Sequence, residues 1–414
     1  MSAGDRPAIA GGTPQRSRPL AYARHQLDEA DVTAVVESLR SGALTGGPDI
    51  ARFERLLAGV CGAAHAVAVS SGTAALDLAV AALGVGPEDE VITSPLTFVA
   101  TANAVVRSGG SPVFADIGPD RCLDPAAVAA RVTPRTRAVI AVDYAGMPAD
   151  VDAIRLALPR PLPVIADGAQ SLGGRLGGRP VGSLADITTL SFHAVKPVTS
   201  GEGGACVTDD GALAESVRRG RNHGMTSTAQ ERSALNWRYD VTSLGSNHRM
   251  TSFQAALGAA QLSRLETGRE RRRELADRYD RLLGKLPGIT LPPRPPERES
   301  SWHLYAVEVS PEDFGCPRDK VIDALRAEGI QATLHYPAVH LLAMYRSRGG
   351  RPGMAPRAER LTERLVTLPL FAGMTDADQD DVVAALIRIQ SWAASRPGWA
   401  VEHGEPPAHP GQPT

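Results

Sequence analysis

Short apolar runs alternate with helix-like patterns between residues 66 and 210, and this alternation restricts the fold more than any other feature of the chain. The runs contain few polar residues, as in strands that are covered on both faces. The segments that we expect to form strands are AVAV (66–69), VIT (91–93), PVFADI (112–117), AVIAV (138–142), PVIA (163–166), ITTL (187–190) and GACVTD (204–209). The pattern predicts an α/β fold with a mainly parallel sheet flanked by helices.

The pattern changes after about residue 260. A long charged helix pattern covers residues 261–283 and is followed by a proline-rich stretch (LPPRPPERES), a strand-like segment (SWHLYAVEV) and a helix pattern (DKVIDALRAEG). This order predicts a smaller α+β domain. We therefore expect a large domain over residues 19–262 and a small C-terminal domain over residues 263–395. Residues 1–18 and 396–414 are rich in Gly, Pro and charge, so we expect a disordered arm and a disordered tail.

The first strong helix signal is DEADVTAVVESLRSG, residues 28–42. Asp28 is a suitable N-cap and Gly42 is a suitable terminator. The apolar residues Val32, Val35, Val36 and Leu39 share one face of this helix. A second charged segment holds the arginines 271, 272 and 273, interleaved with Glu270, Glu274 and Asp277, and we interpret it as a solvated helix face.

Composition and charge exclude several classes of protein. The formal net charge of −2 over 414 residues gives no sign of a nucleic-acid or acidic-lipid partner. The four cysteines lie far apart and form no CxxC pair, which argues against a metal site and for a reducing cytoplasm. No apolar run reaches the about 18 residues that span a bilayer. We expect a cytoplasmic enzyme of two domains.

Polar side chains follow five of the predicted strands, at the point where each strand ends. They are Ser70 to Thr73, Thr97 with Phe98, Asp143 with Tyr144, Asp167 with Gln170, and Ser191 with His193 and Lys196. Ligands of open α/β sheets bind at the carboxyl ends of the strands. We therefore expect these side chains to meet in one site.

This set of groups suits pyridoxal phosphate. SSGTAAL offers backbone N–H groups at a helix N-terminus, which is suited to a phosphate although Ser-Gly-Thr also begins many helices as a plain cap. Asp167 has two interpretations, a helix cap or the partner of a pyridine nitrogen. Lys196 is harder to explain as a structural residue, because a lysine in a low-dielectric site has the depressed pKa that suits a bond to an aldehyde. Together the phosphate cradle, the carboxylate, the aromatic ring and the lysine favour this cofactor.

Eight motifs carry a resemblance to a known family. They are SGALTGGPDIARFERLLA, AVSSGTAALDLA, SPLTFVATANAV, IADGAQSLGG, SFHAVKPVTSGEGGA, LGSNHRMTSFQAALG, SWHLYAVEV and LHYPAVH. From about Leu20 to about Trp392 the chain resembles the DegT/StrS family of pyridoxal-phosphate-dependent sugar aminotransferases. The resemblance implies a fold-type-I aminotransferase, and the combination of Asp-x-x-Gln, SFHxxK and GEGG is its most specific part.

The resemblance assigns roles residue by residue. Lys196 matches the lysine that bonds the cofactor aldehyde, and Asp167 matches the partner of the pyridine nitrogen. Gln170 matches the residue facing the ring hydroxyl, and Phe98 matches the aromatic residue stacked on the ring. The positions that match phosphate contacts are Gly72, Thr73, Ala74 and Ser191.

The motif SNHRM implies a shared active site. Asn247 matches an asparagine that reaches the phosphate of the neighbouring subunit's cofactor, so the resemblance implies a homodimer. Arg249 matches an arginine near the active site. The chain departs from the family at His248, where Tyr or Phe is usual, and at Gly168, where Ala is common.

The residues that we expect to face the substrate are Tyr144, His193, Arg249 and His335, with His303 and Tyr336 as weaker candidates. Two of them have structural alternatives. His193 is equally consistent with a core histidine bonded to backbone, and Tyr144 with a packing role.

The resemblance also implies a reaction. The amino donor is expected to be L-glutamate and the acceptor a nucleotide-linked keto-deoxysugar. VDYAG together with SFHAVKP is most similar to enzymes that aminate C4 of UDP-linked 4-keto-6-deoxy sugars. Alternatives within the family are cyclitol and dTDP-3-keto-sugar aminotransferases. Other members of the family are dehydratases in which His replaces the lysine, and the presence of Lys196 argues against that activity. A non-catalytic cofactor-binding regulator is a further alternative, although we recognise no DNA-binding segment in the N-terminal arm.

Overall fold

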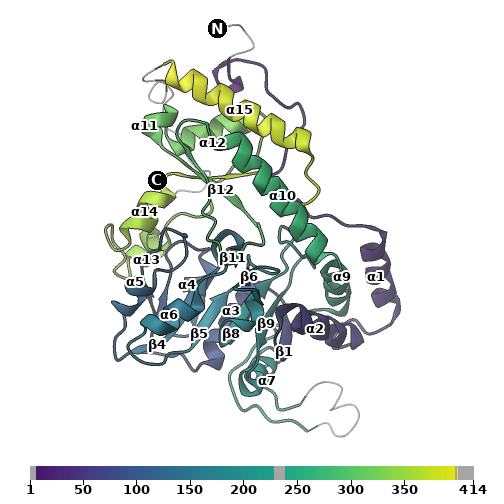
Figure 1. Ribbon diagram of the computed structural model, residues 1–414. Coiled ribbons are helices and arrows are strands. Elements are labelled where there is room, and N and C mark those ends of the chain that lie inside the picture. The colour runs from purple at the N-terminus through teal and green to yellow at the C-terminus, as the bar shows by residue number, and fades with distance from the viewer. Residues whose placement is uncertain (1–5, 228–237, 397–398, 400–414) are drawn as a thin grey trace, which may run out of the picture.

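The computed structural model describes residues 6–227, 238–396 and 399 (Figure 1). A seven-stranded sheet forms the centre of the N-terminal part of the chain. Its strands, in spatial order, are β1 (His65–Val69), β9 (Gly204–Thr208), β8 (Ile187–Ser191), β5 (Val164–Asp167), β4 (Thr136–Val142), β2 (Glu90–Thr93) and β3 (Ser111–Phe114). Strand β9 runs antiparallel to both of its neighbours, β1 and β8, while the pairs from β8 to β3 are parallel. The mainly parallel sheet predicted from the apolar runs is confirmed.

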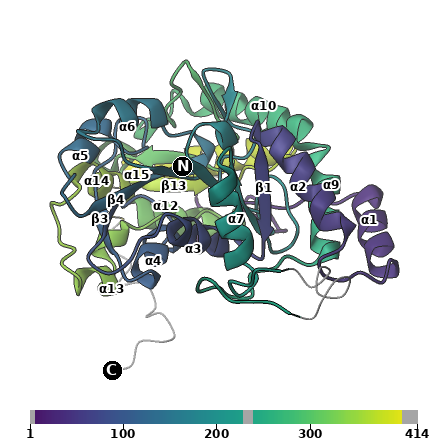
Figure 2. The ribbon, with the colours of Figure 1, turned by 90° about the horizontal axis from the view of Figure 1, so that it is seen from below.

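Helices cover both faces of this sheet (Figure 2). In β1, Val67 and Val69 face one helical layer while Ala66 and Ala68 face the other. This alternation follows from the two-residue period of a strand, so an uninterrupted apolar run buries both faces. The first layer contains α3 (Gly72–Ala82), α4 (Ala100–Arg107) and α7 (Gly211–Gly220), and the second contains α2 (Pro48–Cys61), α5 (Pro125–Ala129), α6 (Val151–Ala157) and α9 (Ser252–Leu262).

The C-terminal part has its own antiparallel sheet and one large core. The strands are β10 (Ile289–Thr290), β12 (Tyr305–Val309) and β13 (Leu365–Leu368). The helices are α10 (Leu265–Leu283), α11 (Pro311–Phe314), α12 (Arg318–Ala327), α13 (Ala343–Arg346), α14 (Pro356–Thr362) and α15 (Asp376–Ala394). A third small sheet, made of β11 (Arg298–Glu299), β6 (Arg175–Leu176) and β7 (Arg179–Pro180), joins the two parts. The described short 3-10 helices are η2 (Ala8–Ala10), η3 (Tyr144–Gly146), η4 (Val181–Ser183) and η5 (Val339–Leu341).

The N-terminal arm differs from the prediction of disorder. From residue 6 it lies along the C-terminal part near α15 (Figure 1). Glu328, which is fully buried, accepts hydrogen bonds from the backbone N–H groups of Ala8 (2.9 Å) and Gln15 (2.8 Å) and pairs with Arg388. A buried carboxylate needs such partners, and the arm supplies two of them. Of the predicted tail only residues 396 and 399 lie within the described residues, and Trp399 is buried.

Helix α1 (Glu29–Arg40) begins at the predicted cap but buries a different face. The Asp28 side chain accepts from Asp31 N and completes a capping box. Val32 and Leu39 of the predicted apolar face are each 49% exposed, whereas Asp31 and Ser38 are buried. Polar contacts hold the buried side, because Asp31 pairs with Arg264 and Ser38 donates to Asp49 (2.6 Å).

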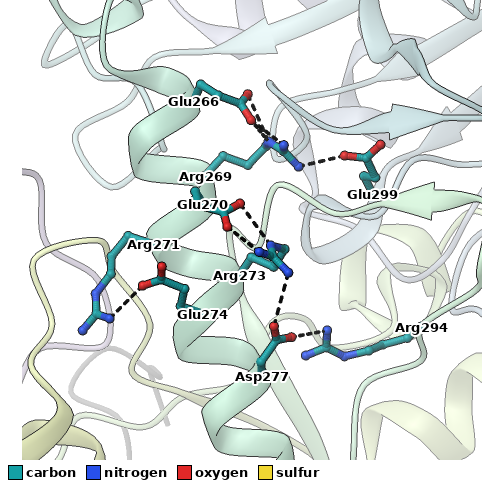
Figure 3. Close-up of polar contacts among 9 residues, drawn as sticks. All are labelled: Glu266, Arg269, Glu270, Arg271, Arg273, Glu274, Asp277, Arg294 and Glu299. Atoms are coloured by element: carbon teal, nitrogen blue, oxygen red, sulfur yellow. Dashed lines mark hydrogen bonds and ion pairs between the residues drawn. The ribbon is translucent and has the colours of Figure 1, made fainter.

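The charged segment 261–283 forms two helices rather than one, since α9 ends at Leu262 and α10 begins at Leu265. Figure 3 shows ion pairs along α10, among them Arg273 with Glu270 and Arg271 with Glu274. For Arg272 the prediction is wrong, because its side chain is buried on the inner side of the helix.

Candidate active site

Asp167 and Lys196 meet at the carboxyl edge of the central sheet. Asp167 is the last residue of β5, and Lys196 lies in the turn that follows the neighbouring strand β8. Lys196 N donates to His193 O (2.9 Å), which closes this turn. The two side chains interact electrostatically, so that each stabilises the charged form of the other. The prediction that strand ends bring these two residues together agrees with this placement.

Asp167 is a buried carboxylate, only 6% exposed, with a small set of hydrogen bonds. Its Oδ2 accepts from Thr101 Oγ1 (2.6 Å), and its Oδ1 accepts from Ala169 N at a longer 3.3 Å. Burial raises the pKa of Asp167, while the hydrogen bonds and the charge of Lys196 lower it. A further cation beside this carboxylate, such as a protonated pyridine nitrogen, would favour the ionised form.

Lys196 lies among histidines that burial keeps neutral. Lys196 Nζ lies 3.4 Å from Nε2 of His303. Burial lowers the pKa of Lys196 to about 8 and holds the pKa of His303 well below its usual value. Burial and the charge of Lys196 also lower the pKa of His335 to about 4, and His335 Nδ1 lies 3.0 Å from Thr367 Oγ1. A lysine with this pKa holds an appreciable fraction of neutral, nucleophilic amine near pH 8.

Phe98 presents an exposed aromatic ring beside this acid. It precedes α4 by two residues, and its carbonyl accepts from the backbone N of Thr101, the residue that bonds Asp167. Phe98 is 55% exposed, and its ring lies beside that of Tyr336, with ring centroids 5.8 Å apart. An exposed aromatic face next to a buried carboxylate suits a stacked, positively charged pyridine ring.

The N-terminus of α3 lies against the end of β8. Ser71 caps α3 by accepting from Ala74 N (3.1 Å). A Cβ at Gly72 would lie 2.8 Å from Ser191 Cβ, so only glycine lets the helix approach Ser191 this closely. A Cβ at Gly204 in the GEGG turn would meet the Ser71 backbone at 2.3 Å. Backbone N–H groups at the start of α3 and the Ser191 hydroxyl thus gather at one point, as a phosphate requires.

Gln170 and Tyr144 are held by neighbouring backbone and side-chain groups. Gln170 Oε1 accepts from Ala145 N (2.7 Å), and its Nε2 donates to the Tyr336 hydroxyl (3.0 Å), which leaves one amide hydrogen for a ligand. The Tyr144 hydroxyl donates to His335 O (2.5 Å), and its ring is buried. The structure therefore gives Tyr144 a packing role, and its contact with substrate stays a prediction.

His193 is a surface residue. Its side chain is 48% exposed, and Nε2 lies 3.9 Å from Glu202 Oε1. The alternative of a core histidine is therefore wrong, and a role toward substrate stays a prediction.

The SNHRM segment approaches the phosphate cradle through its backbone. Ser70 N donates to His248 O (2.8 Å). The side chains of Asn247 and Arg249 are exposed, and Arg249 Nη1 donates to Asn222 Oδ1 (2.8 Å). The contact of Asn247 with a second subunit's cofactor stays a prediction.

Gly168, which departs from the family pattern, has a local cause. A Cβ there would lie 2.9 Å from Thr188 Cγ2 and 3.1 Å from Ser171 Oγ.

Thr101 is a site residue that the sequence analysis missed. Its only signal was its place three residues after Phe98, on the same side of the turn that leads into α4.

The residues at this edge fit pyridoxal phosphate. Asp167 would meet the ring nitrogen, Phe98 the ring face, Lys196 the aldehyde and the start of α3 the phosphate. The depressed pKa of Lys196 and the exposed ring of Phe98 are features that a purely structural cluster does not need.

Comparisons with known proteins agree with this arrangement. The model of the DegT/DnrJ/EryC1/StrS aminotransferase family matches residues 25–387. The Bacillus subtilis spore coat polysaccharide biosynthesis protein SpsC is 40% identical over 378 residues, which cover 90% of this chain and 97% of SpsC.

Two solved structures extend the likeness to the fold. DesI, solved in the presence of its TDP-sugar product, is 34% identical with a TM-score of 0.85, covering 95% of this chain and 99% of DesI. Spr1654 from Streptococcus pneumoniae, solved in its PLP form, is 29% identical with a TM-score of 0.83, covering 91% of this chain and 99% of Spr1654. The chain therefore belongs to the DegT/DnrJ/EryC1/StrS aminotransferase family, as a pyridoxal-phosphate-dependent enzyme of fold type I.

Proposed function

We propose that the enzyme transfers the amino group of L-glutamate to a nucleotide-linked keto-deoxysugar, at C4 of a UDP-linked 4-keto-6-deoxy sugar. The amine of Lys196 beside the carboxylate of Asp167 is the observation that carries the aminotransferase part of this proposal. The family and the relatives SpsC and DesI support a sugar as acceptor. The motifs VDYAG and SFHAVKP support C4 and UDP by resemblance.

The chain's own residues supply binding and proton transfer. Pyridoxal phosphate, when bound, stores the electrons released as the Cα proton of the amino donor leaves. Lys196 would hold the aldehyde of the bound cofactor. As a free amine Lys196 has a pKa of about 8, which would suit it to accept the Cα proton of the donor near neutral pH and to give it back. His303, neutral and 3.4 Å away, accepts a hydrogen bond from the protonated amine and orients it.

Asp167 and Phe98 fix the ring. Thr101 donates to one oxygen of Asp167, which leaves lone pairs on this carboxylate for the ring nitrogen. In a buried setting this charge pair is stronger than at a surface. Gln170 retains one amide hydrogen for the ring hydroxyl, and the Ser191 hydroxyl lies where the phosphate is expected.

A homodimer with shared sites is part of the proposal. Four apolar side chains of α1, α2 and the segment between them are exposed in the single chain, and we call them the α1–α2 face: Val32, Leu39, Leu44 and Leu56. Isolated exposed leucines are common, but a group on adjacent helices suggests a covered surface. Ser252 N donates to Leu44 O (2.9 Å), so the chain two residues after SNHRM lies beside Leu44 of this face. A second copy seated there would receive Asn247 and Arg249 near its own site.

A TDP-linked keto sugar is the second candidate acceptor, favoured by the similarity to DesI. The experiment that separates the candidates gives the purified holoenzyme L-glutamate and a panel of UDP- and dTDP-linked 3-keto and 4-keto sugars. We expect mass spectrometry to detect replacement of one carbonyl oxygen by an amine in the UDP-linked 4-keto sugar. Amination of a dTDP sugar alone would reassign the nucleotide. If no sugar is aminated although glutamate converts the cofactor, the sugar acceptor is wrong.

A further inference from the structure

Arg272 differs from the other arginines near it on α10. Arg269 pairs with Glu266 and Glu299, Arg271 with Glu274, and Arg273 with Glu270, and all these partners are drawn in Figure 3. The Arg272 side chain is only 8% exposed. It has no carboxylate partner and no hydrogen-bond partner among residues 6–227, 238–396 and 399. A buried, unpaired guanidinium is an unusual feature of a folded chain.

The helix geometry shows what Arg272 faces. Arg269, three residues earlier, pairs with Glu299 at 3.0 Å, and Tyr279, seven residues later, packs on Tyr305 with ring centroids 4.8 Å apart. Residues spaced by three and by seven lie on one side of an α-helix. Arg272 therefore faces the chain between Glu299 and Tyr305, the segment that contains His303.

His303 connects this segment to the reacting groups. Its Nε2 lies 3.4 Å from Lys196 Nζ, and the charges of Lys196 and Arg272 both lower its pKa. The neighbouring Ser301 donates to Gln170 O (2.6 Å), which fixes the same segment to the cofactor side of the site. The guanidinium thus lies on the side of the site where Lys196 acts.

An anion is the group missing from this arrangement. Burial lowers the pKa of Arg272 only to about 10, so the guanidinium stays charged at neutral pH. Leaving a buried cation unpaired is costly, and an arriving anion would remove the cost. The fully enclosed nitrogens that lack a hydrogen-bond partner belong to other arginines, such as Arg278 Nη1 and Arg388 Nε. None of the Arg272 nitrogens is among them, so its guanidinium keeps some accessible surface.

The identity of this anion follows from the position of Lys196 and rests on the proposed function. The cofactor phosphate is expected at the start of α3, near Ser191 and not on α10. The amino donor reacts at the carbon that Lys196 holds, and its α-carboxylate is only two bonds from its amino nitrogen. We propose that Arg272 binds the α-carboxylate of the amino donor. A planar guanidinium binds a carboxylate through two parallel hydrogen bonds, which also orients the donor.

The test measures binding without turnover. Glutarate carries the carboxylates of glutamate but no amine, so it binds without reacting. Isothermal titration of glutarate into the holoenzyme should show a Kd about 10- to 100-fold higher for Arg272→Met than for the wild type. Arg269→Met is the matched control, since it removes a paired arginine of the same helix, and its glutarate Kd should change less than about twofold.

A second readout uses the amino donors. L-glutamate should convert the cofactor band with a much higher apparent Kd in Arg272→Met. 4-Aminobutyrate lacks the α-carboxylate, so its apparent Kd for converting the cofactor band should be the same in the wild type and in Arg272→Met. Arg272→Lys keeps the charge but not the two parallel N–H donors of the guanidinium, so it should recover part of the affinity for glutarate. Thermal melting checks the fold, and loss of an unpaired cation should leave the melting temperature of Arg272→Met unchanged or higher.

Three results would overturn the inference. One is a glutarate Kd that is equal in wild type and Arg272→Met. The second is a selective loss of UDP or dTDP affinity, which would assign Arg272 to a phosphate. The third is dissociation of the oligomer with unchanged glutarate affinity, which would assign it to an acid of a partner subunit. Failure of L-glutamate to convert the wild-type cofactor would instead contradict the proposed donor, and the glutarate titration would still decide the role of Arg272.

Discussion

Nζ of Lys196 lies 3.4 Å from Nε2 of His303, a residue of the C-terminal part of the chain. Lys196 follows a strand of the central sheet, so this contact joins the two parts at the amine that we propose performs the chemistry. Burial keeps the imidazole neutral, and a neutral ring accepts a hydrogen bond from the ammonium form without repelling it as a second cation. A motion of the C-terminal part would therefore change the setting of Lys196 directly.

Replacing Lys196 by alanine removes the group that we propose bonds the cofactor. The wild-type holoenzyme should absorb in the visible region through this bond, and Lys196→Ala should lose both the band and turnover. Circular dichroism should match that of the wild type, because the side chain stabilises no core contact. An unchanged visible spectrum in Lys196→Ala would contradict the assignment of this lysine.

The depressed pKa of Lys196 predicts a pH dependence of cofactor loading. Only the neutral amine attacks the aldehyde, and its fraction rises with pH through a midpoint of about 8. The rate at which the visible band forms on cofactor-free protein should rise about tenfold per pH unit below this value and level off by about pH 9. A rate that still rises above pH 10 would indicate an ordinary, solvated lysine.

Asp167→Asn tests the charge partner of the ring. The amide cannot stabilise a protonated pyridine nitrogen, so we expect turnover to fall at least about 100-fold, or about 2.7 kcal/mol. The phosphate cradle at Gly72 to Ala74 is untouched, so inorganic phosphate should bind as before. The charge of Asp167 raises the pKa of Lys196, and the midpoint of cofactor loading should therefore move below 8 in Asp167→Asn. Near-normal turnover would contradict the assignment.

Gly168 offers a test of packing behind the site. In Gly168→Ala the new methyl would lie 2.9 Å from Thr188 Cγ2, and we expect a loss of about 1–3 kcal/mol in the free energy of unfolding. Urea unfolding of the cofactor-free protein measures it. Thr188→Ser removes Cγ2 and keeps the hydroxyl that donates to Val181 O, so the double variant should recover much of the loss. If the double variant recovers nothing, the contact with Thr188 is not the cause.

The central sheet and the Asp167–Lys196 pair could be predicted from the sequence because their signals are local. Uninterrupted apolar runs define strands buried on both faces, and the residues just after each run meet at one edge. The ordering of the N-terminal arm could not be predicted, since it depends on Glu328, more than 300 positions away.

The two helix faces show where local pattern fails. In α1 the apolar side is half exposed, because Asp31 and Ser38 find ion-pair and hydrogen-bond partners in α9, α2 and the loops beside them. In α10 the run of arginines suggested a solvated face, yet Arg272 lies seven residues after Leu265 and seven before Tyr279, both buried. That spacing indicates that Arg272 lies on the buried side of the helix. The acidic residues that alternate with the arginines made the whole segment resemble a solvated face.

The shared active site can be tested by mixing inactive chains. If Asn247 serves the partner's cofactor, a heterodimer of Lys196→Ala and Asn247→Ala chains has one site with both changes and one with neither. Random pairing makes about half of the dimers mixed, and each restores one of two sites, so activity should approach about a quarter of wild type. The test requires that Asn247→Ala alone be strongly impaired, since its phosphate contact is worth only ~1.5–3 kcal/mol. Arg249→Ala is the substitute if it is not.

A control pair fixes the meaning of any recovery. Lys196 and Asp167 interact within one chain, so mixing Lys196→Ala with Asp167→Ala chains leaves one change in every site and should restore nothing. Recovery in the Asn247 mixture alone, with equal heterodimer content by tagged pull-down, would place the asparagine across the subunit boundary. If both mixtures stay inactive although the heterodimers form, SNHRM serves its own subunit, as the hydrogen bond between Ser70 and His248 within one chain would then suggest.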